Sequence, residues 1–331
     1  VEGRALLLDY LREYRIPFAV CGKLVVAVEP GELPRLEELR SRGAANGVPG
    51  IEVLDERQIR EIEPAVRGLR ALWVPTAGIV DFSTVAGRLA DEIRAAGVRL
   101  ELGARVTAVE RTPSGVRLRT AGGTVEAQAA IACAGLQADR IAALAGRPTA
   151  PRIVPFRGDY YVLRPERRSL IRGLVYPVPD PRFPFLGVHF TRRIDGAVWL
   201  GPIAVLAFAR EGYRRSDLNV RDLVGSIGYR GFQRLAARHW RTGLAELARD
   251  YWRPAFLAAL RRYVPELRGA DLLPGPSGVR AQALAPDGRL LDDFAYDVSG
   301  TFLNVRNAPS PAATSSFALA REFADRLAEL H

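Results

Sequence analysis

Methionine is absent from all 331 residues of the chain. The chain therefore does not begin with one, and it opens directly on a helical pattern of apolar residues over 3–14, GRALLLDYLREY. We expect from this opening that the polypeptide has lost its original N-terminus.

Cysteine and histidine are also scarce. The two cysteines, Cys21 and Cys133, lie far apart in apolar stretches, which predicts buried free thiols rather than a secreted disulfide framework. Three dispersed histidines offer no metal-ligand spacing, so we expect no metal. The sequence has no signal peptide and no apolar run of about 18 residues, which predicts a cytoplasmic chain without an integral membrane segment.

Lysine is almost missing, because Lys23 is the only lysine among 47 basic residues. The arginines are spread along the chain, and we interpret the formal net charge of +10 mainly as codon bias. A dense basic tract with interleaved aromatic residues is absent, so nucleic acid is not an expected partner.

The order of the predicted elements indicates an α/β fold of mixed α+β character. Strands and helices alternate at both ends of the chain, and a β-rich, aromatic block begins at Pro151. This pattern predicts a nucleotide-binding domain that a second domain interrupts. We assign residues 1–17, 76–150 and 270–331 to the first domain, and residues 18–75 and 151–269 to the second.

The local patterns predict one strand over residues 18–29 and a helix over 82–96 with Gly97 beyond its end. They also predict a hairpin turn at 194–196, two or three helices between about 218 and 267, and a strand beginning at Gly278.

Three stretches could carry chemistry. The segment NAPSPAATSS, residues 307–316, starts a helix with small side chains and free N–H groups, which favour an anion or an electron-rich carbonyl; the alternative is an ordinary capped surface helix. Arg280 lies in the otherwise apolar stretch GVRAQAL, where its fork could bind a carboxylate or could pair with Asp292 or Asp293. His189 lies in an apolar strand and is either a core residue or a general base.

Seven stretches are distributed over nearly the whole chain: PTAGIVDF, ACAGLQADR, PFRGDYYVL, YPVPDPRFPFLGVHFTRRIDG, GPSGVRAQAL, DGRLLDDF and VRNAPSPAATSSFALA. Together, and in this order, they resemble the L-2-hydroxyglutarate dehydrogenase/oxidase family, within the D-amino-acid-oxidase-like FAD flavoproteins. The resemblance implies a Rossmann-like FAD-binding domain interleaved with a β-rich substrate domain. It also implies oxidation of L-2-hydroxyglutarate to 2-oxoglutarate by hydride transfer to the flavin.

The resemblance also implies roles for individual residues. Arg280 corresponds to the arginine that clamps the α-carboxylate of the substrate, and His189 is the leading candidate for the base. The second carboxylate needs an anchor, for which the candidates are Arg157, Tyr160, Tyr176 and Arg192. The residues expected to contact FAD are Val106, Ala134, Gly135, Ala312, Ala313 and Thr314.

One departure from the family pattern concerns the first βαβ segment. The sequence contains no G-x-G-x-x-G turn of the kind that binds the FAD pyrophosphate. We therefore expect an incomplete FAD-binding domain, and two alternatives stay open: an amine or amino-acid oxidase of the same superfamily, or a catalytically inactive truncated remnant. The implied electron acceptor is a quinone or oxygen, and a quinone would place the protein at the periphery of the inner membrane.

Overall fold

The computed structural model describes residues 1–180 and 187–329. The helices are α1 (Glu2–Glu13), α2 (Leu33–Ala45), α3 (Glu56–Ile62), α4 (Phe82–Ala95), α5 (Ala138–Leu144), α6 (Val220–Ile227), α7 (Arg230–Tyr251), α8 (Arg253–Arg261) and α9 (Ala312–Ala328). None of the helices in these residues has the length and apolar character needed to traverse a bilayer.

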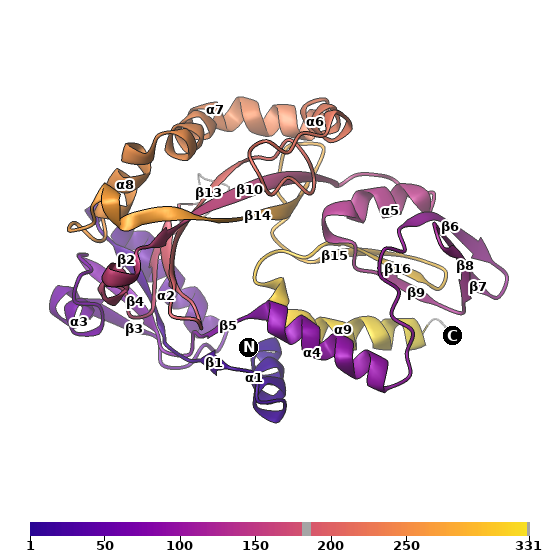
Figure 1. Ribbon diagram of the computed structural model, residues 1–331, viewed down its shortest axis with the longest axis horizontal. Coiled ribbons are helices and arrows are strands. Elements are labelled where there is room, and N and C mark those ends of the chain that lie inside the picture. The colour runs from indigo at the N-terminus through magenta and orange to yellow at the C-terminus, as the bar shows by residue number, and fades with distance from the viewer. Residues whose placement is uncertain (181–186, 330–331) are drawn as a thin grey trace.

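The largest of the described sheets has eight strands and lies on the side of the molecule that α7 and α8 cover (Figure 1). Its order is β14 (Leu272–Leu284), β10 (Arg152–Leu163), β13 (Val198–Leu206), β12 (His189–Arg192), β11 (Leu174–Pro177), β2 (Lys23–Ala27), β4 (Arg70–Val74) and β3 (Glu52–Asp55). Only the β11–β2 pair is parallel among the pairings of this sheet in the described residues.

Helices α7 and α8 pass over one face of this sheet (Figure 1). There, alternate strand residues such as Leu24, Phe190 and Leu200 pack with Phe256 and Leu260 of α8 in the largest apolar core. Because side chains alternate between the two faces of a strand, the residues between these core positions point to the other face. That other face carries the polar residues described below.

Three smaller sheets complete the described structure. The strands β15 (Ala295–Ser299), β16 (Phe302–Asn307) and β9 (Ala130–Ala132) form one sheet, in which β16 and β9 are parallel. The strands β6 (Val106–Thr112), β7 (Gly115–Thr120) and β8 (Gly123–Ala127) form a meander, and β1 (Phe18–Ala19) pairs with β5 (Ile79–Val80). Helices α1, α4 and α9 lie together beside these elements (Figure 1).

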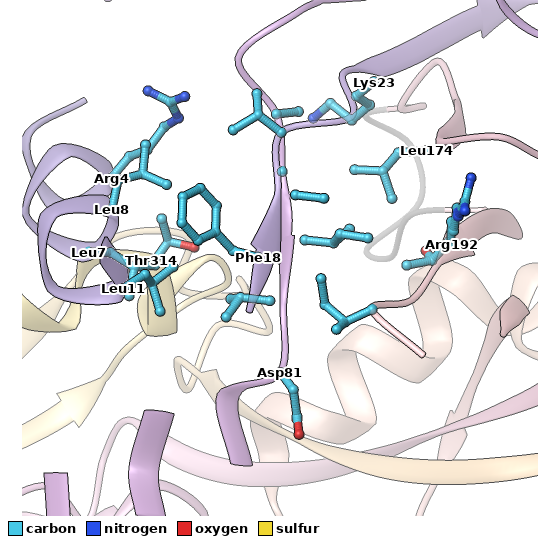
Figure 2. A pocket seen from close by; sticks show the side chains of 18 of the residues that line it. Arg4, Leu7, Leu8, Leu11, Phe18, Lys23, Asp81, Leu174, Arg192 and Thr314 are labelled. Atoms are coloured by element: carbon cyan, nitrogen blue, oxygen red, sulfur yellow. The ribbon is translucent and has the colours of Figure 1, made fainter. Parts of the chain in front are cut away.

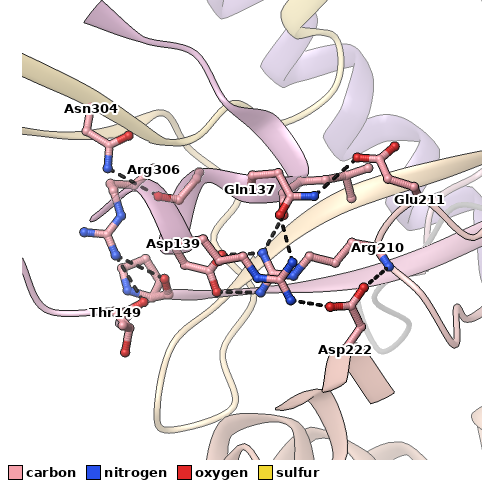
Figure 3. Close-up of polar contacts among 12 residues, drawn as sticks. Gln137, Asp139, Thr149, Arg210, Glu211, Asp222, Asn304 and Arg306 are labelled. Carbon is pink, nitrogen blue, oxygen red and sulfur yellow. Dashed lines mark hydrogen bonds and ion pairs between the residues drawn. The ribbon is translucent and has the colours of Figure 1, made fainter. Parts of the chain in front are cut away.

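Ion pairs join α5 to the segment that follows β13 (Figure 3). The carboxylate of Asp139 pairs with both terminal nitrogens of Arg210, at 2.8 Å for Nη2 to Oδ2, and both residues are buried. The backbone N–H of Arg210 donates to Asp222, which also pairs with Arg140. Arg210 donates further to the carbonyl of Leu136, so the network fixes the turn that precedes α5. Removing one member of the network would leave a buried charge without its ion-pair partner.

Several expectations about local structure are confirmed. The turn around residues 194–196 joins β12 and β13 in an antiparallel hairpin, and three helices occupy the region between residues 218 and 267. Helix α4 begins after Asp81, whose side chain accepts a hydrogen bond from Ser83 N at 3.1 Å, and it is followed by Gly97 with φ of +73°. Helix α9 begins at Ala312, within the predicted segment.

Three expectations were wrong in detail. Cys133 is exposed and Cys21 is only half-buried, because both lie in loops just outside the strands. Residues 18–29 form two strands instead of one, because Gly22 adopts φ of +73° and packs against the Trp73 ring. The strand that carries Arg280 begins at Leu272 rather than at Gly278. The division into two domains stays a prediction. The strand β14, which we assigned to the first domain, lies at the edge of the large sheet beside β10 of the second.

Candidate active site

A cluster of polar side chains lies on the face of the large sheet opposite the α8 core. It consists of Lys23 on β2, Tyr160 on β10, Tyr176 on β11, His189 on β12 and Arg280 on β14, and we call it the polar sheet face. The positive charges of Arg280 and Lys23 both lower the pKa of His189. The charge of Arg280 also opposes the burial that raises the pKa of Tyr160, so these side chains lie within electrostatic range of one another. The fold thus brings together residues that are up to about 260 positions apart in sequence.

His189 occupies the middle of this cluster, and it is buried. Its Nδ1 lies 3.1 Å from the carbonyl oxygen of Gly187. A carbonyl can only accept, so Nδ1 carries the hydrogen and Nε2 is left with a lone pair. Burial lowers the pKa of His189 to about 4, with smaller contributions from the positive charges of Arg280 and Lys23. The imidazole is therefore neutral at physiological pH and able to accept a proton at Nε2.

Tyr176 holds the imidazole from one side. Its ring stacks on that of His189, with centroids 4.1 Å apart and planes inclined by 21°. Burial raises the pKa of Tyr176, so its hydroxyl stays protonated. The ammonium of Lys23 lies 5.3 Å from the centre of the same ring, in the range of a cation–π contact. The stack fixes the orientation of the base.

Glycines leave space between His189 and Arg280. Gly201 pairs with His189, while Gly158 and Gly278 pair with each other next to the Phe156–Arg280 pair. A Cβ at Gly201 would lie 2.9 Å from the carbonyl oxygen of Asp159, whereas a Cβ at Gly278 would meet no atom within 4 Å. The surface above Gly278 is thus open to a small molecule that approaches Arg280.

Arg280 and Tyr160 form the far side of the polar sheet face. The Arg280 side chain keeps exposed surface, yet the protein around it is dense enough that desolvation lowers its pKa. Burial raises the pKa of Tyr160, and its ring packs on Trp199 with centroids 5.2 Å apart. The guanidinium carbon of Arg193 lies 4.2 Å from the centre of the Trp199 ring. Arg193 also lines the cleft that is described below. This side of the site offers a guanidinium fork and a phenol hydroxyl to an anion.

A second feature is a groove of about 340 Å³ lined mainly by small side chains, which we call the small-residue groove. Its walls come from the turn before α5, from β14 and β16, and from the first turn of α9; the lining includes Gly135, Ala138, Ala281, Ala312 and Ala313. Ala281 directly follows Arg280 in β14. Because adjacent strand residues point in opposite directions, β14 presents Ala281 to the groove and Arg280 to the polar sheet face.

The small-residue groove fits part of a flavin. Pro311 provides no side-chain cap for α9, so the first N–H groups of this helix are available to an acceptor such as the pyrimidine edge of a flavin. Gly135 has φ of +47°, which lets the backbone turn close to a ligand without a Cβ in the way. The alanines leave the floor of the groove without bulk. These features favour flavin contact over an ordinary capped surface helix.

A cleft of about 740 Å³ lies between α1 and the large sheet (Figure 2). In this view Arg4, Leu7 and Thr314 lie on one side of the β1 ribbon, and Lys23 and Arg192 lie on the other side. The cleft is also lined by Tyr176, which stacks on His189. It therefore connects the start of α9 with one end of the polar sheet face and offers a route to it.

The predicted cofactor residues fall into three groups. Gly135, Ala312 and Ala313 line the small-residue groove, and Ala134 immediately precedes it in the chain. Thr314 lines the cleft on the other side of the α9 start. Val106 lies apart from both, at the start of β6 in an apolar cluster with β9. Their contacts with FAD stay predictions.

The four predicted anchors for the second carboxylate also divide. Tyr160 and Tyr176 belong to the polar sheet face. Arg192 is exposed on the cleft wall and donates to the carbonyl of Arg172 at 3.2 Å. Arg157 is buried, with its Nε 2.8 Å from Asp159 and its Nη2 3.5 Å from Asp250. These ion pairs favour a structural role for Arg157, and substrate binding by it stays a prediction.

No role was predicted for Lys23 from the sequence. It lies about 150 residues before Tyr176 and His189, and nothing in its local sequence GKLVV marks a site. The parallel pairing of β2 with β11 brings it beside Tyr176. The one signal in the sequence was that Lys23 is the only lysine among the basic residues.

The FAD dependent oxidoreductase family model, DAO, matches residues 1–326. The L-2-hydroxyglutarate dehydrogenases of Caenorhabditis elegans and Homo sapiens, both described as mitochondrial, are 46% and 44% identical to the chain. These alignments cover 97% and 99% of the chain and 76% and 74% of the relatives. The L-2-hydroxyglutarate dehydrogenase of Escherichia coli is 41% identical over 94% of the chain and 74% of its own length.

Solved structures show the same fold. The L-alpha-glycerophosphate oxidase of Mycoplasma pneumoniae, solved with FAD bound, has a TM-score of 0.74 at 22% identity and is matched over 98% of this chain and 77% of its own. The glycine oxidase of Geobacillus kaustophilus has a TM-score of 0.70 at 19% identity, over 98% and 78% of the two chains. At these identities the likeness concerns the fold, and it confirms the mixed α/β architecture.

Proposed function

Since the chain belongs to the DAO family of FAD-dependent oxidoreductases, we propose that it oxidises L-2-hydroxyglutarate to 2-oxoglutarate. The observation that carries this proposal is the polar sheet face, in which a neutral, buried His189 lies among cationic side chains. A base that accepts the hydroxyl proton, next to groups that bind carboxylates, is what a 2-hydroxy acid requires.

The residues have distinct parts in this reaction. Arg280 binds the α-carboxylate through its fork, which places C2 and its hydroxyl above the open surface at Gly278. His189 takes the hydroxyl proton at Nε2 while the C2–O bond becomes a carbonyl. Bound FAD would supply the hydride acceptor for the hydrogen at C2. The hydroxyls of Tyr160 and Tyr176 donate hydrogen bonds to the substrate.

The substrate panel that tests this function compares hydroxy acids with amines. Anaerobic bleaching of the flavin is measured with L-2-hydroxyglutarate, D-2-hydroxyglutarate, a D-amino acid and N-methylglycine. We expect rapid bleaching with L-2-hydroxyglutarate alone. The neutral imidazole of His189 can accept the proton of an alcohol. Binding of the α-carboxylate by Arg280 lets only one configuration at C2 present its hydroxyl to that base. Faster bleaching by either amine would favour the amine oxidase alternative instead, and no bleaching by any compound would favour an inactive chain.

The cofactor position is tested at Ala312. We propose that the start of α9, between the small-residue groove and the cleft, holds the pyrimidine edge of the flavin, with the rest of the ring in the cleft toward the polar sheet face. Ala312→Leu should therefore lower FAD affinity by about 5- to 150-fold, the effect of forcing extra methyl groups into a packed site. Leucine suits a helix, so the fold should persist. The measurement is flavin bound per chain together with the melting temperature. Ala324→Leu, at an exposed position of the same helix, is the control. Parent-like flavin binding by the Ala312 variant would place the flavin elsewhere.

A further inference from the structure

Lys23 is an unusual residue for its position. It is the only lysine of the chain, and it lies half-buried at the start of β2 on the wall of the cleft. Burial lowers its pKa. Within the described part of the chain no carboxylate forms an ion pair with it, and its Nζ lies 5.3 Å from the centre of the Tyr176 ring. A cation that is partly removed from water without a carboxylate favours binding of an external anion.

The position of Lys23 complements that of Arg280. In the order of the large sheet, His189 on β12 lies between β14, which carries Arg280, and β2, which carries Lys23. Both charges act on the imidazole of His189, so both cationic groups flank the proposed base. A molecule held over His189 thus meets positive charge at each end, as a dicarboxylate requires.

The two cations differ in the geometry that they impose. The guanidinium of Arg280 is planar and binds a carboxylate through two parallel hydrogen bonds, which orients the adjacent carbon. The ammonium of Lys23 is a compact point charge on a flexible stem, which tolerates different positions of a terminal group. The fork therefore suits the carboxylate next to the reacting carbon, and the ammonium suits the remote one.

We propose that the ammonium of Lys23 binds the distal carboxylate of the substrate and so selects dicarboxylic over monocarboxylic 2-hydroxy acids. This assignment rests on the proposed function, because it takes the α-carboxylate to be on Arg280. It adds a residue to the four anchors predicted from the sequence, and it gives the polar sheet face a second cationic end.

The kinetic test compares two substrates of equal chain length. L-2-hydroxyglutarate carries the distal carboxylate, and L-2-hydroxyvalerate replaces it with a methyl group. In the holoenzyme, Lys23→Met should raise the concentration of L-2-hydroxyglutarate for half-maximal flavin reduction by about 10- to 100-fold, the effect of losing one charged hydrogen bond. The concentration of L-2-hydroxyvalerate for half-maximal flavin reduction should stay at the parent value. Arg57→Met, at an exposed position, removes one charge far from the polar sheet face and controls for net charge.

A direct test uses the fact that the chain has one lysine. Reductive methylation with ¹³C-formaldehyde labels Lys23 and the N-terminal amine, which serves as the internal control in the NMR spectrum. We expect 2-oxoglutarate to shift the Lys23 signal and 2-oxovalerate to leave it in place. This measurement needs no turnover, and it applies even if Lys23→Met fails to fold.

The outcomes separate the two proposals. If the parent is not reduced by L-2-hydroxyglutarate, the proposed function fails. If the flavin of the parent is reduced but Lys23→Met raises the half-maximal concentrations of both substrates equally, the assignment of Lys23 is overturned while the function stands. The same conclusion follows if 2-oxoglutarate leaves the Lys23 signal unshifted.

Discussion

Replacing His189 by glutamine should slow flavin reduction by L-2-hydroxyglutarate by about 10²- to 10⁴-fold, the usual contribution of a positioned base. Glutamine keeps a polar side chain of similar size but cannot take the proton that Nε2 accepts. The flavin should remain bound, because His189 lies on the polar sheet face and not among the residues that line the small-residue groove. The measurement is anaerobic stopped-flow reduction of the variant and the parent.

His239→Gln provides the matched control, since this histidine lies in α7 away from the polar sheet face. It should reduce its flavin like the parent. If His189→Gln does so too, His189 is a packing residue beneath Tyr176, which was the alternative interpretation of its sequence context.

The pH dependence gives a second readout of the same residue. Because burial lowers the pKa of His189 to about 4, the imidazole is already neutral above that pH. We expect kcat/KM to stay level as the pH falls through 6.5, the ordinary histidine value, and to decline only as the pH approaches about 4. An acid limb between pH 6 and 7 that disappears in His189→Gln would contradict the buried, desolvated state of this base.

Changes at Arg280 should have the next largest effect. Lysine keeps the charge but loses the planar fork that orients C2, so Arg280→Lys should raise KM and also lower kcat. Arg280→Ala should lose more, because a charged hydrogen bond of about 1.5–3 kcal/mol disappears with the side chain. Flavin content should stay at the parent level in both variants, since Arg280 is not among the residues that line the small-residue groove.

The readout for Arg280 is the dependence of the anaerobic reduction rate on L-2-hydroxyglutarate concentration. Arg119→Ala, at an exposed arginine on β7, shows the effect of removing an arginine outside the site. If Arg280→Ala saturates at the same substrate concentration as the parent, the α-carboxylate is held by another residue. Loss of folding in Arg280→Ala together with normal kinetics in Arg280→Lys would assign Arg280 to a structural ion pair.

Local patterns predicted the parts of the site that depend on neighbouring residues. The two prolines and small side chains at 309–316 predicted where α9 begins, because helix starts follow from residues within one turn. The turn at 194–196 predicted the hairpin that carries His189, since hairpin turns have their own sequence signature. The resemblance of whole motifs then supplied the cofactor and the reaction.

Long-range pairing accounts for what the sequence could not predict. The open surface at Gly278 exists because this residue pairs with Gly158, about 120 positions earlier, and no local pattern states that register. Lys23 reaches the site through the β2–β11 pairing, which joins two segments about 150 residues apart. The burial of Arg157 depends on Asp250 at the end of α7, so its sequence context PFRGD showed only a basic residue in a strand.

We propose that this chain removes a hydride from C2 of L-2-hydroxyglutarate at the polar sheet face. The most direct measurement is single-turnover anaerobic reduction of the holoenzyme by L-2-hydroxyglutarate, unlabelled and carrying deuterium at C2, with the 2-oxoglutarate released determined per flavin reduced. We expect one 2-oxoglutarate per reduced flavin and a slower reduction with the deuterated substrate. Flavin that stays oxidised, or that is reduced without formation of 2-oxoglutarate, would contradict this account.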